Sequence, residues 1–283
     1  QKKAADSRRN WWKFCRIILL NAAAAEKSTE FKRRCDMPVT FEGKVISCGR
    51  QEGKLFWLPD PPVRVAVLKT EFVDAEVIHF KTVLSAAKEK LEKWYAMAVK
   101  EFGEKAADIF DMQLSILYDE CSLTDSVVEL IDTEHMSAEK AIEYQFGCFV
   151  QLLRTVGDKG GRERADAAEE LKQLLLSLAL GIHRQRICPR EDTILILQSL
   201  SAADMVSMDC RYIAGIGVLA GVTEEPLAFM AKQRKIPLVS ELRDCRGRLY
   251  HGRNAVLDAD AGLLLVRGTK GGKECAEKIK KQV

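Results

Sequence analysis

The residues that could carry out chemistry in this sequence are most concentrated in one glycine-bearing stretch, GVTEEPLAFMAKQRKIPLV, at residues 221–239. A glycine loop that opens into a helix suits phosphate, because free backbone N–H groups and the helix dipole favour an anion. Here the first helical turn contains Glu224, Glu225 and Pro226. Two carboxylates would repel a phosphate dianion, and proline has no N–H to donate. The stretch therefore has the glycine loop and helix of a phosphate site but not the side chains and N–H groups that would bind phosphate.

The four histidines are the other residues suited to nucleophilic or acid–base chemistry, because imidazole attacks electrophiles and exchanges protons near neutral pH. They lie at dispersed positions: His79, His135, His183 and His251. None of them falls within the stretch 221–239. A surface or packing role is the simpler interpretation of each.

The composition is that of a globular protein long enough for two domains. Of the 283 residues, 47% are hydrophobic and 30% charged, which fits neither a disordered nor a membrane-spanning chain. The net charge of +3 is too small to favour nucleic acid as a partner. The nine cysteines are scattered without a C-x-x-C pair, which disfavours a zinc ribbon and a disulfide framework. Reduced thiols in a cytoplasmic protein are the simplest account.

The first forty residues have a different character from the rest. The segment WWKFCRIILLNAAAAE has an apolar middle, but Lys13 and Arg16 interrupt it and it is too short to span a bilayer. We expect residues 1–40 to form a helical extension that packs on the body or on a partner. Binding to a membrane surface is the less favoured alternative.

A strand-like pattern gives way to a helical one in the first two thirds of the chain. The runs FEGKVIS and KLFWL predict short strands within residues 41–68. Residues 73–182 show amphipathic helical spacing, with Ser137 at an N-cap position and GDKGG as an interruption before the last helix. Antiparallel helices with short connections predict a bundle. The first helical stripe consists of Phe80, Leu84, Ala87, Leu91, Trp94 and Ala98.

Strands and short helices alternate from residue 191 onward, which predicts a small α/β unit. The strand-like runs are DTILILQ, YIAGIGVLAG and IPLV, and the helical runs are SAADMVSM and PLAFMAKQR. NAVLDADAGLLLV reads as a closing hairpin with Gly262 at its turn. The strands near residue 41 are too few to be stable alone, so we expect them to complete this later unit.

Five segments occur in an order that resembles a known family. They are GKVISCGRQEGKLFWL, EFGEKAADIFDMQLSILYDE, EHMSAEKAI, GRERADAAEELKQLLL and NAVLDADAGLLLV. In sequence and order they resemble the N-terminal half of enzyme I of the bacterial phosphotransferase system, a phosphoenolpyruvate–protein phosphotransferase. The resemblance covers residues 41–283.

The resemblance implies an α+β or α/β two-domain fold, in which an inserted antiparallel helical bundle interrupts a small swivelling α/β phosphohistidine-type domain. The implied boundaries are an N-terminal extension at 1–40, the α/β domain at 41–70 and 183–267, the HPr-binding-like bundle at 71–182 and a linker helix at 268–283.

In this family a histidine of the α/β domain takes phosphate from phosphoenolpyruvate and passes it to the carrier protein HPr, which binds the bundle. A separate C-terminal barrel binds phosphoenolpyruvate and Mg²⁺ and mediates dimerisation. No barrel-sized segment follows Val283 in this sequence. We therefore expect no cofactor in this chain, and HPr or an HPr-like carrier as its partner; the oligomeric state is left open.

The family's phosphorylation motif is altered at its decisive position. The motif is Gly-Gly, a basic residue and Thr-Ser-His-Thr, and it aligns from Gly221. Val222 then replaces the second glycine, and Pro226, after Glu224 and Glu225, stands in place of the histidine. We therefore predict no catalytic residue at the family's site. In the bundle segment that supports the histidine, Ala167 and Glu169 replace an aspartate and an arginine. Ala202 replaces the proline of a Thr-Pro-Ser-Asp turn that keeps Asp204.

The carrier-binding surface of the family is matched in part. Glu104, Ile116 and Glu120 agree in character with family contact positions. Lys105 reverses the charge of a family glutamate, and Ser115 and Cys121 also depart from the pattern. Retained carrier binding and an ordinary solvated helix surface both fit these residues.

Three functions remain open at this point. The first is a degenerate relative that acts by protein binding or regulation. The second is a phosphotransferase that is active only in a longer chain with a C-terminal barrel, through another nucleophile. The third is a swivelling domain of a pyruvate phosphate dikinase or phosphoenolpyruvate synthase, which the inserted bundle disfavours.

Overall fold

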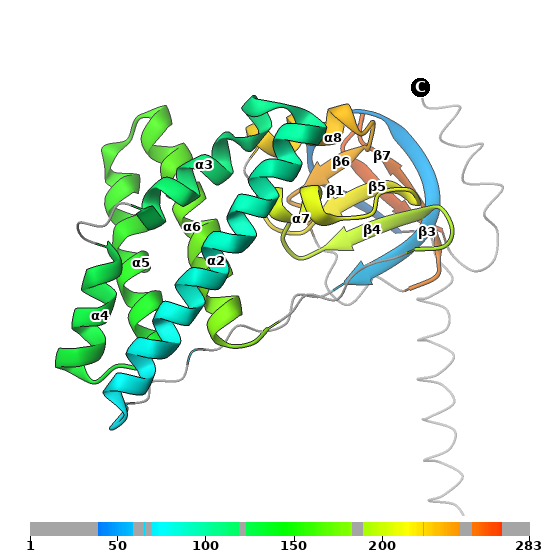
Figure 1. The fold of residues 1–283 in the computed structure, drawn as a ribbon. Helices are drawn as coiled ribbons and strands as arrows, with labels where there is room; N and C mark the ends of the chain where they lie inside the picture. The colour runs from blue at the N-terminus through cyan, green and yellow to red at the C-terminus, as the bar shows by residue number, and fades with distance from the viewer. Residues whose placement is uncertain are drawn as a thin grey trace, which may run out of the picture.

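The computed structural model describes residues 39–58, 65, 69–118, 123–182, 189–222, 224–243 and 251–267. Nearly all of the predicted extension at 1–40 and the whole predicted linker at 268–283 lie outside these ranges. Within them, a group of helices stands beside a curved sheet (Figure 1).

Five helices form the helical part. They are α2 (Val73–Phe102), α3 (Glu104–Tyr118), α4 (Leu123–Glu134), α5 (Ala138–Val156) and α6 (Lys159–Ala179). The apolar stripe predicted for the first helix is confirmed: Phe80, Ala87, Leu91 and Ala98 are buried. Leu84 and Trp94 are partly buried against the same core. Burial of such stripes, rather than helix propensity alone, stabilises these helices.

Specific residues end and begin the helices. Gly103, with a φ of 88°, separates α2 from α3. The predicted N-cap at Ser137 is confirmed, since its hydroxyl accepts the Lys140 N–H. The predicted interruption at GDKGG is longer than the one in the structure, because α6 already begins at Lys159. The Asp158 carboxylate accepts the Gly161 N–H as the N-cap of α6, and a Cβ at Gly161 would lie 2.9 Å from that carboxylate.

The sheet contains eight described strands. They are β1 (Val39–Glu42), β2 (Lys44–Ser47), β3 (Arg50–Leu58), β4 (Thr193–Leu197), β5 (Ile213–Val218), β6 (Leu238–Ser240), β7 (Asn254–Asp258) and β8 (Leu263–Val266). Their order is β1-β8-β7-β3-β4-β5-β6-β2. The central strands β3 to β6 are parallel, and the outer pairs are antiparallel. The predicted hairpin is confirmed as β7–β8.

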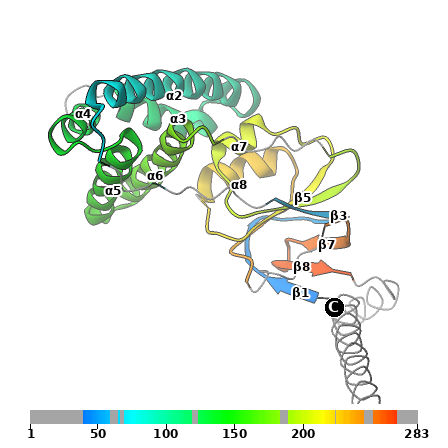
Figure 2. The same ribbon diagram turned by 90° about the horizontal axis from the view of Figure 1, so that it is seen from below.

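The run FEGKVIS is not one strand, as its pattern suggested, but two strands at opposite ends of the strand order. Only Gly43 separates β1 from β2, so the sheet must curl until its two edges meet there. The Gly43 N–H donates to the Gly262 carbonyl at 2.9 Å, and the Arg243 N–H donates to the Glu42 carbonyl at 2.9 Å. Figure 2 shows β3, β7, β8 and β1 in succession along this curled sheet.

Side chains alternate between two cores along the sheet. Ile194 and Ile196 point into the interior of the curl with Phe41, Leu55 and Leu257.

The neighbours Leu195 and Leu197 face the helices α7 (Ala202–Ser207) and α8 (Glu224–Gln233) and share one apolar cluster with the helical part. A capping box between Ser201 and Asp204 starts α7. The predicted mixed α/β fold class is therefore confirmed. None of the helices in the described ranges is long and apolar enough to cross a membrane.

We expect Gly262→Ala to destabilise the fold more than Gly252→Ala. Both glycines have positive φ, 70° and 76°, which costs a side chain about 1 kcal/mol. A Cβ at Gly262 would also lie 2.7 Å from the Gly43 carbonyl, whereas one at Gly252 meets nothing within 4 Å. Urea unfolding should give a loss of about 3 kcal/mol for Gly262→Ala and about 1 kcal/mol for Gly252→Ala. Equal losses would show that the close approach at Gly43 does not constrain the sheet.

Candidate functional site

The stretch 221–239 begins just after the carboxyl end of β5, runs through α8 and ends in β6. Helix α8 follows β5 and buries Leu227 and Met230 in the apolar cluster shared with the bundle. The helix begins at Glu224, two residues before the predicted start at Pro226. Proline is tolerated there because the first N–H groups of a helix have no partner within it.

The first turn of α8 offers no nucleophile at the position of Pro226, which is half-buried. A proline side chain has neither a lone pair nor a proton to transfer, and its ring nitrogen cannot donate to an anion. Thr223 and the side chain of Glu224 lie outside the described part of the chain. Glu225 is exposed and is the first charged side chain of α8 that can be placed.

Glu225 pairs with a cation from the helical part. Lys159 Nζ, at the start of α6, donates to Glu225 Oε1 at 2.7 Å and lies 3.6 Å from Glu163 Oε1. The hydrogen bond from Lys159 lowers the pKa of Glu225, and the charges of Lys159 and Lys105 lower it further. The same hydrogen bond raises the pKa of Lys159. The carboxylate of Glu225, which would repel phosphate, thus forms an ion pair with Lys159 of the bundle.

The described histidines make their contacts away from Pro226. His79 Nε2 lies 3.5 Å from Glu139 Oε1, between α2 and α5. His135, just after α4, has a φ of 55°. His251 Nδ1 accepts the Trp57 N–H at 3.2 Å, and its ring stacks edge-on against Phe56. His183 lies outside the described residues.

The predicted carrier-binding residues do not converge on one spot. Glu104 is the exposed first residue of α3, directly after Gly103. Ile116 is partly buried against the apolar core, twelve positions further along α3 and thus about 18 Å away. Glu120 lies outside the described ranges. A partner that touches both described residues must extend along most of α3.

The residues that replace the family's supporting groups have structural partners. Ala167 is fully buried, and its carbonyl accepts from Gln113 Nε2 at 3.3 Å. Burial raises the pKa of Glu169, but hydrogen bonds from Lys172 and Gln173 outweigh it, so that the pKa lies below its ordinary value. Ala167 thus belongs to the packed core of the bundle, and Glu169 pairs with Lys172 on the same helix.

Two residues that form ion pairs near the ends of α8 were not singled out by the sequence. Lys159 lies in the GDKGG segment, and only the fold brings it to Glu225. Arg234, directly after α8, forms an ion pair with Glu101 of α2. Both look like solvated charges in the sequence, since no local pattern reveals a partner far along the chain. Among the described residues, no group of three or more histidine, cysteine, aspartate or glutamate side chains could hold a metal ion.

Comparisons with known proteins give a consistent result. The family described as PEP-utilising enzyme, N-terminal, matches residues 42–164. The phosphoenolpyruvate-protein phosphotransferase of Bacillus subtilis (strain 168) is 26% identical over 226 residues, which are 80% of this chain and 40% of that protein. The protein of the same name from Borreliella burgdorferi is 28% identical over 231 residues, again 80% of this chain and 40% of the relative.

Solved structures agree in fold. An NMR solution structure of enzyme I superposes with a TM-score of 0.69 at 24% identity, over 86% of this chain and 98% of that chain. The chain is similar in sequence to phosphoenolpyruvate-protein phosphotransferases and in fold to the N-terminal part of enzyme I. The N-terminal domain of Enzyme 1 - Nitrogen superposes with a TM-score of 0.57 at 20% identity, over 85% and 99% of the two chains. The chain spans about 40% of the length of the curated proteins that it matches.

We expect Lys159→Met to raise the pKa of Glu225 towards its ordinary value, because it removes the hydrogen bond that lowers this pKa. NMR titration of the side-chain carboxyl carbon measures the change. Lys140→Met, which removes the partner of Glu143 within α5, is the control and should leave Glu225 unaffected. An unchanged pKa of Glu225 in Lys159→Met would contradict the ion pair.

The sign of the pH dependence follows from these shifts. The folded-state pKa of Glu225 is lowered, so its contribution to stability is present above the unfolded-state pKa and is lost as pH falls through the lowered value. The pKa of Lys159 is raised, so its contribution is present below the unfolded-state pKa and is lost as pH rises through the raised value. Both side chains are largely exposed, and the stabilisation is correspondingly small.

Proposed function

We propose that this relative of the N-terminal part of enzyme I acts in the cytoplasm by binding HPr or an HPr-like carrier protein, without accepting phosphate at helix α8. The proposal combines the retained fold with a first turn that lacks the family's nucleophile. Catalysis of phosphoryl transfer needs a nucleophile in line with the phosphorus and groups that stabilise the transferred charge. Pro226 provides neither.

The observation that supports loss of phosphorylation most directly is the position of Pro226 inside the first turn of α8. The turn is helical and packed through Leu227, and the sequence contains no histidine between His183 and His251. The pair between Glu225 and Lys159 also occupies the side of α8 that faces the bundle. Both features favour a rigid helix start over an exchange site for phosphate.

Carrier binding is supported by the bundle and by Glu104. Proteins named phosphoenolpyruvate-protein phosphotransferases match this chain across the bundle. Glu104 is exposed at the start of α3, where the helix dipole stabilises its carboxylate and leaves it free to meet a basic side chain of a partner. The neighbouring Lys105 opposes such a partner. We therefore expect weaker binding than that of a family member with two acidic residues at this place.

We expect the chain to acquire no acid-labile phosphate when it is incubated with phosphorylated HPr. The physical reason is that no imidazole occupies the start of α8. Intact mass measurement, before and after brief acid treatment, detects a phosphohistidine as a mass that disappears. The corresponding N-terminal part of the Bacillus subtilis relative, prepared in the same way, is the control. Acid-labile phosphate on this chain would contradict the proposal.

Titration with unphosphorylated HPr tests the binding half of the proposal separately. We expect a Kd in the micromolar range for the unmodified chain and about tenfold weaker binding for Glu104→Lys, because a rim charge that attracts is replaced by one that repels. Calorimetry measures the Kd, and NMR shifts should map to α3. Glu134→Lys, at the exposed end of α4, is the matched control and should bind like the unmodified chain. Absence of binding would contradict the proposed carrier binding, and only the similarity of fold to enzyme I would remain.

A further inference from the structure

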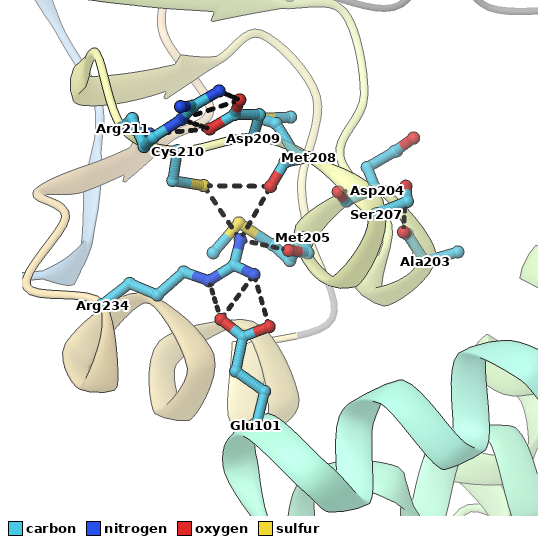
Figure 3. Close-up of polar contacts among 10 residues, drawn as sticks. All are labelled: Glu101, Ala203, Asp204, Met205, Ser207, Met208, Asp209, Cys210, Arg211 and Arg234. Carbon is cyan, nitrogen blue, oxygen red and sulfur yellow. Dashed lines mark hydrogen bonds and ion pairs between the residues drawn. The ribbon is translucent and has the colours of Figure 1, made fainter.

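The carboxyl end of α8 places a largely buried arginine between the sheet and the bundle. Arg234 follows α8 directly, and its side chain is only 12% exposed. Figure 3 shows its guanidinium between Glu101 of α2 on one side and the segment from Met205 to Cys210 on the other. A charge in such a place is costly unless every donor is paired.

The bundle side of this contact is a two-pronged ion pair. Arg234 Nε donates to Glu101 Oε1 at 2.7 Å, and Nη2 donates to Glu101 Oε2 at 2.8 Å. The guanidinium also lies 5.0 Å from the ring centre of Phe102. Beside it, Gln233 Nε2 donates to the Phe102 carbonyl at 3.3 Å. Two parallel hydrogen bonds fix the orientation of the guanidinium relative to the carboxylate. A single point charge, such as the ammonium group of lysine, would leave this orientation variable.

The sheet side consists of backbone and sulfur acceptors. Arg234 Nη1 donates to the carbonyls of Met205 and Met208 and to Cys210 Sγ, the last at 2.9 Å. These residues end α7 and lead into β5. Burial raises the pKa of the Cys210 thiol. Glu101 is the carboxylate that pairs directly with Arg234. Hydrogen bonds from Arg211, and in addition the charge of Arg234, lower the pKa of the neighbouring Asp209. One side chain thus connects α8, α2 and the α7–β5 connection.

The apolar contacts between the two parts constrain their relative angle less strictly than directional hydrogen bonds do. Phe102, Met205 and Met230 belong to one continuous cluster, and hydrophobic contacts are non-directional. We propose that Arg234 is the latch that sets the orientation of the sheet relative to the helical bundle. The two parts keep one arrangement while the guanidinium holds Glu101 and the α7 carbonyls, and they reorient about the apolar contact when the ion pair is broken.

Residual dipolar couplings from the two parts of the full chain test this latch. In the unmodified protein, the amides of α2–α6 and of β3–β6 should fit one common alignment tensor. Arg234→Lys keeps the charge but loses the fork, and Arg234→Met loses both. We expect separate tensors for the two parts in both variants. We also expect the Gly103 and Met208 amides, which donate to the Val99 and Asp204 carbonyls, to exchange hydrogen at least about tenfold faster, because the ends of α2 and α7 lose their anchor to Arg234 and open more often.

The matched control removes an ion pair that lies within the sheet. Arg267 Nη2 lies 2.8 Å from Glu52 Oε1, so Arg267→Met breaks a comparable pair without touching the bundle and should keep one tensor. Should Arg234→Met fail to fold, Glu101→Gln decides, because it removes only the charge on the bundle side at a half-exposed position. Folded Arg234→Lys or Glu101→Gln protein that retains the common tensor and the original orientation would overturn the latch.

Discussion

The sheet of this protein depends on one point of closure, where Gly43 joins strands that stand at opposite ends of the strand order. Because β1 and β2 follow each other in the chain, neither edge can move without the other. The close approach of Gly262 to the Gly43 backbone has no room for a side chain, so the curl depends on glycine at both positions. Near this closure, the Leu242 N–H donates to the Val218 carbonyl at the carboxyl end of β5, the strand that leads to α8.

Helix α8 is the element on which sheet, bundle and candidate site meet. Its buried side packs into the shared apolar cluster, its first turn meets α6 through Glu225, and the residue after its last turn meets α2 through Arg234. Polar contacts at both ends of α8 therefore supplement the apolar contact that the helix makes along its length. A helix that exchanged phosphate at its first turn would need a nucleophile and anion donors there. In this chain the same turn instead contributes to the joint between the two parts.

The sequence was most informative where a local pattern determines the structure. The stripe from Phe80 to Ala98 predicted α2 because burial repeats with the helical period, and Ser137 predicted a helix start because its hydroxyl caps a free N–H group. The split of FEGKVIS was not predictable from such a pattern, because it depends on the partners β8 and β6, which lie more than 190 residues further along the chain. The pairs of Lys159 and Arg234 escaped prediction for the same reason: each unites residues that only the tertiary structure brings together.

Closure of the sheet also has a consequence for behaviour in solution. Unpaired strand edges are templates for intermolecular β-pairing, and proteins restrain them by keeping edge strands short or covered. Here β1 and β2, the terminal strands of the order, have four residues each and converge at Gly43, where Arg243 and Gly262 already use neighbouring backbone groups. The described sheet therefore presents little free edge for such pairing, and the same glycine contact that accompanies its curvature is what leaves so little.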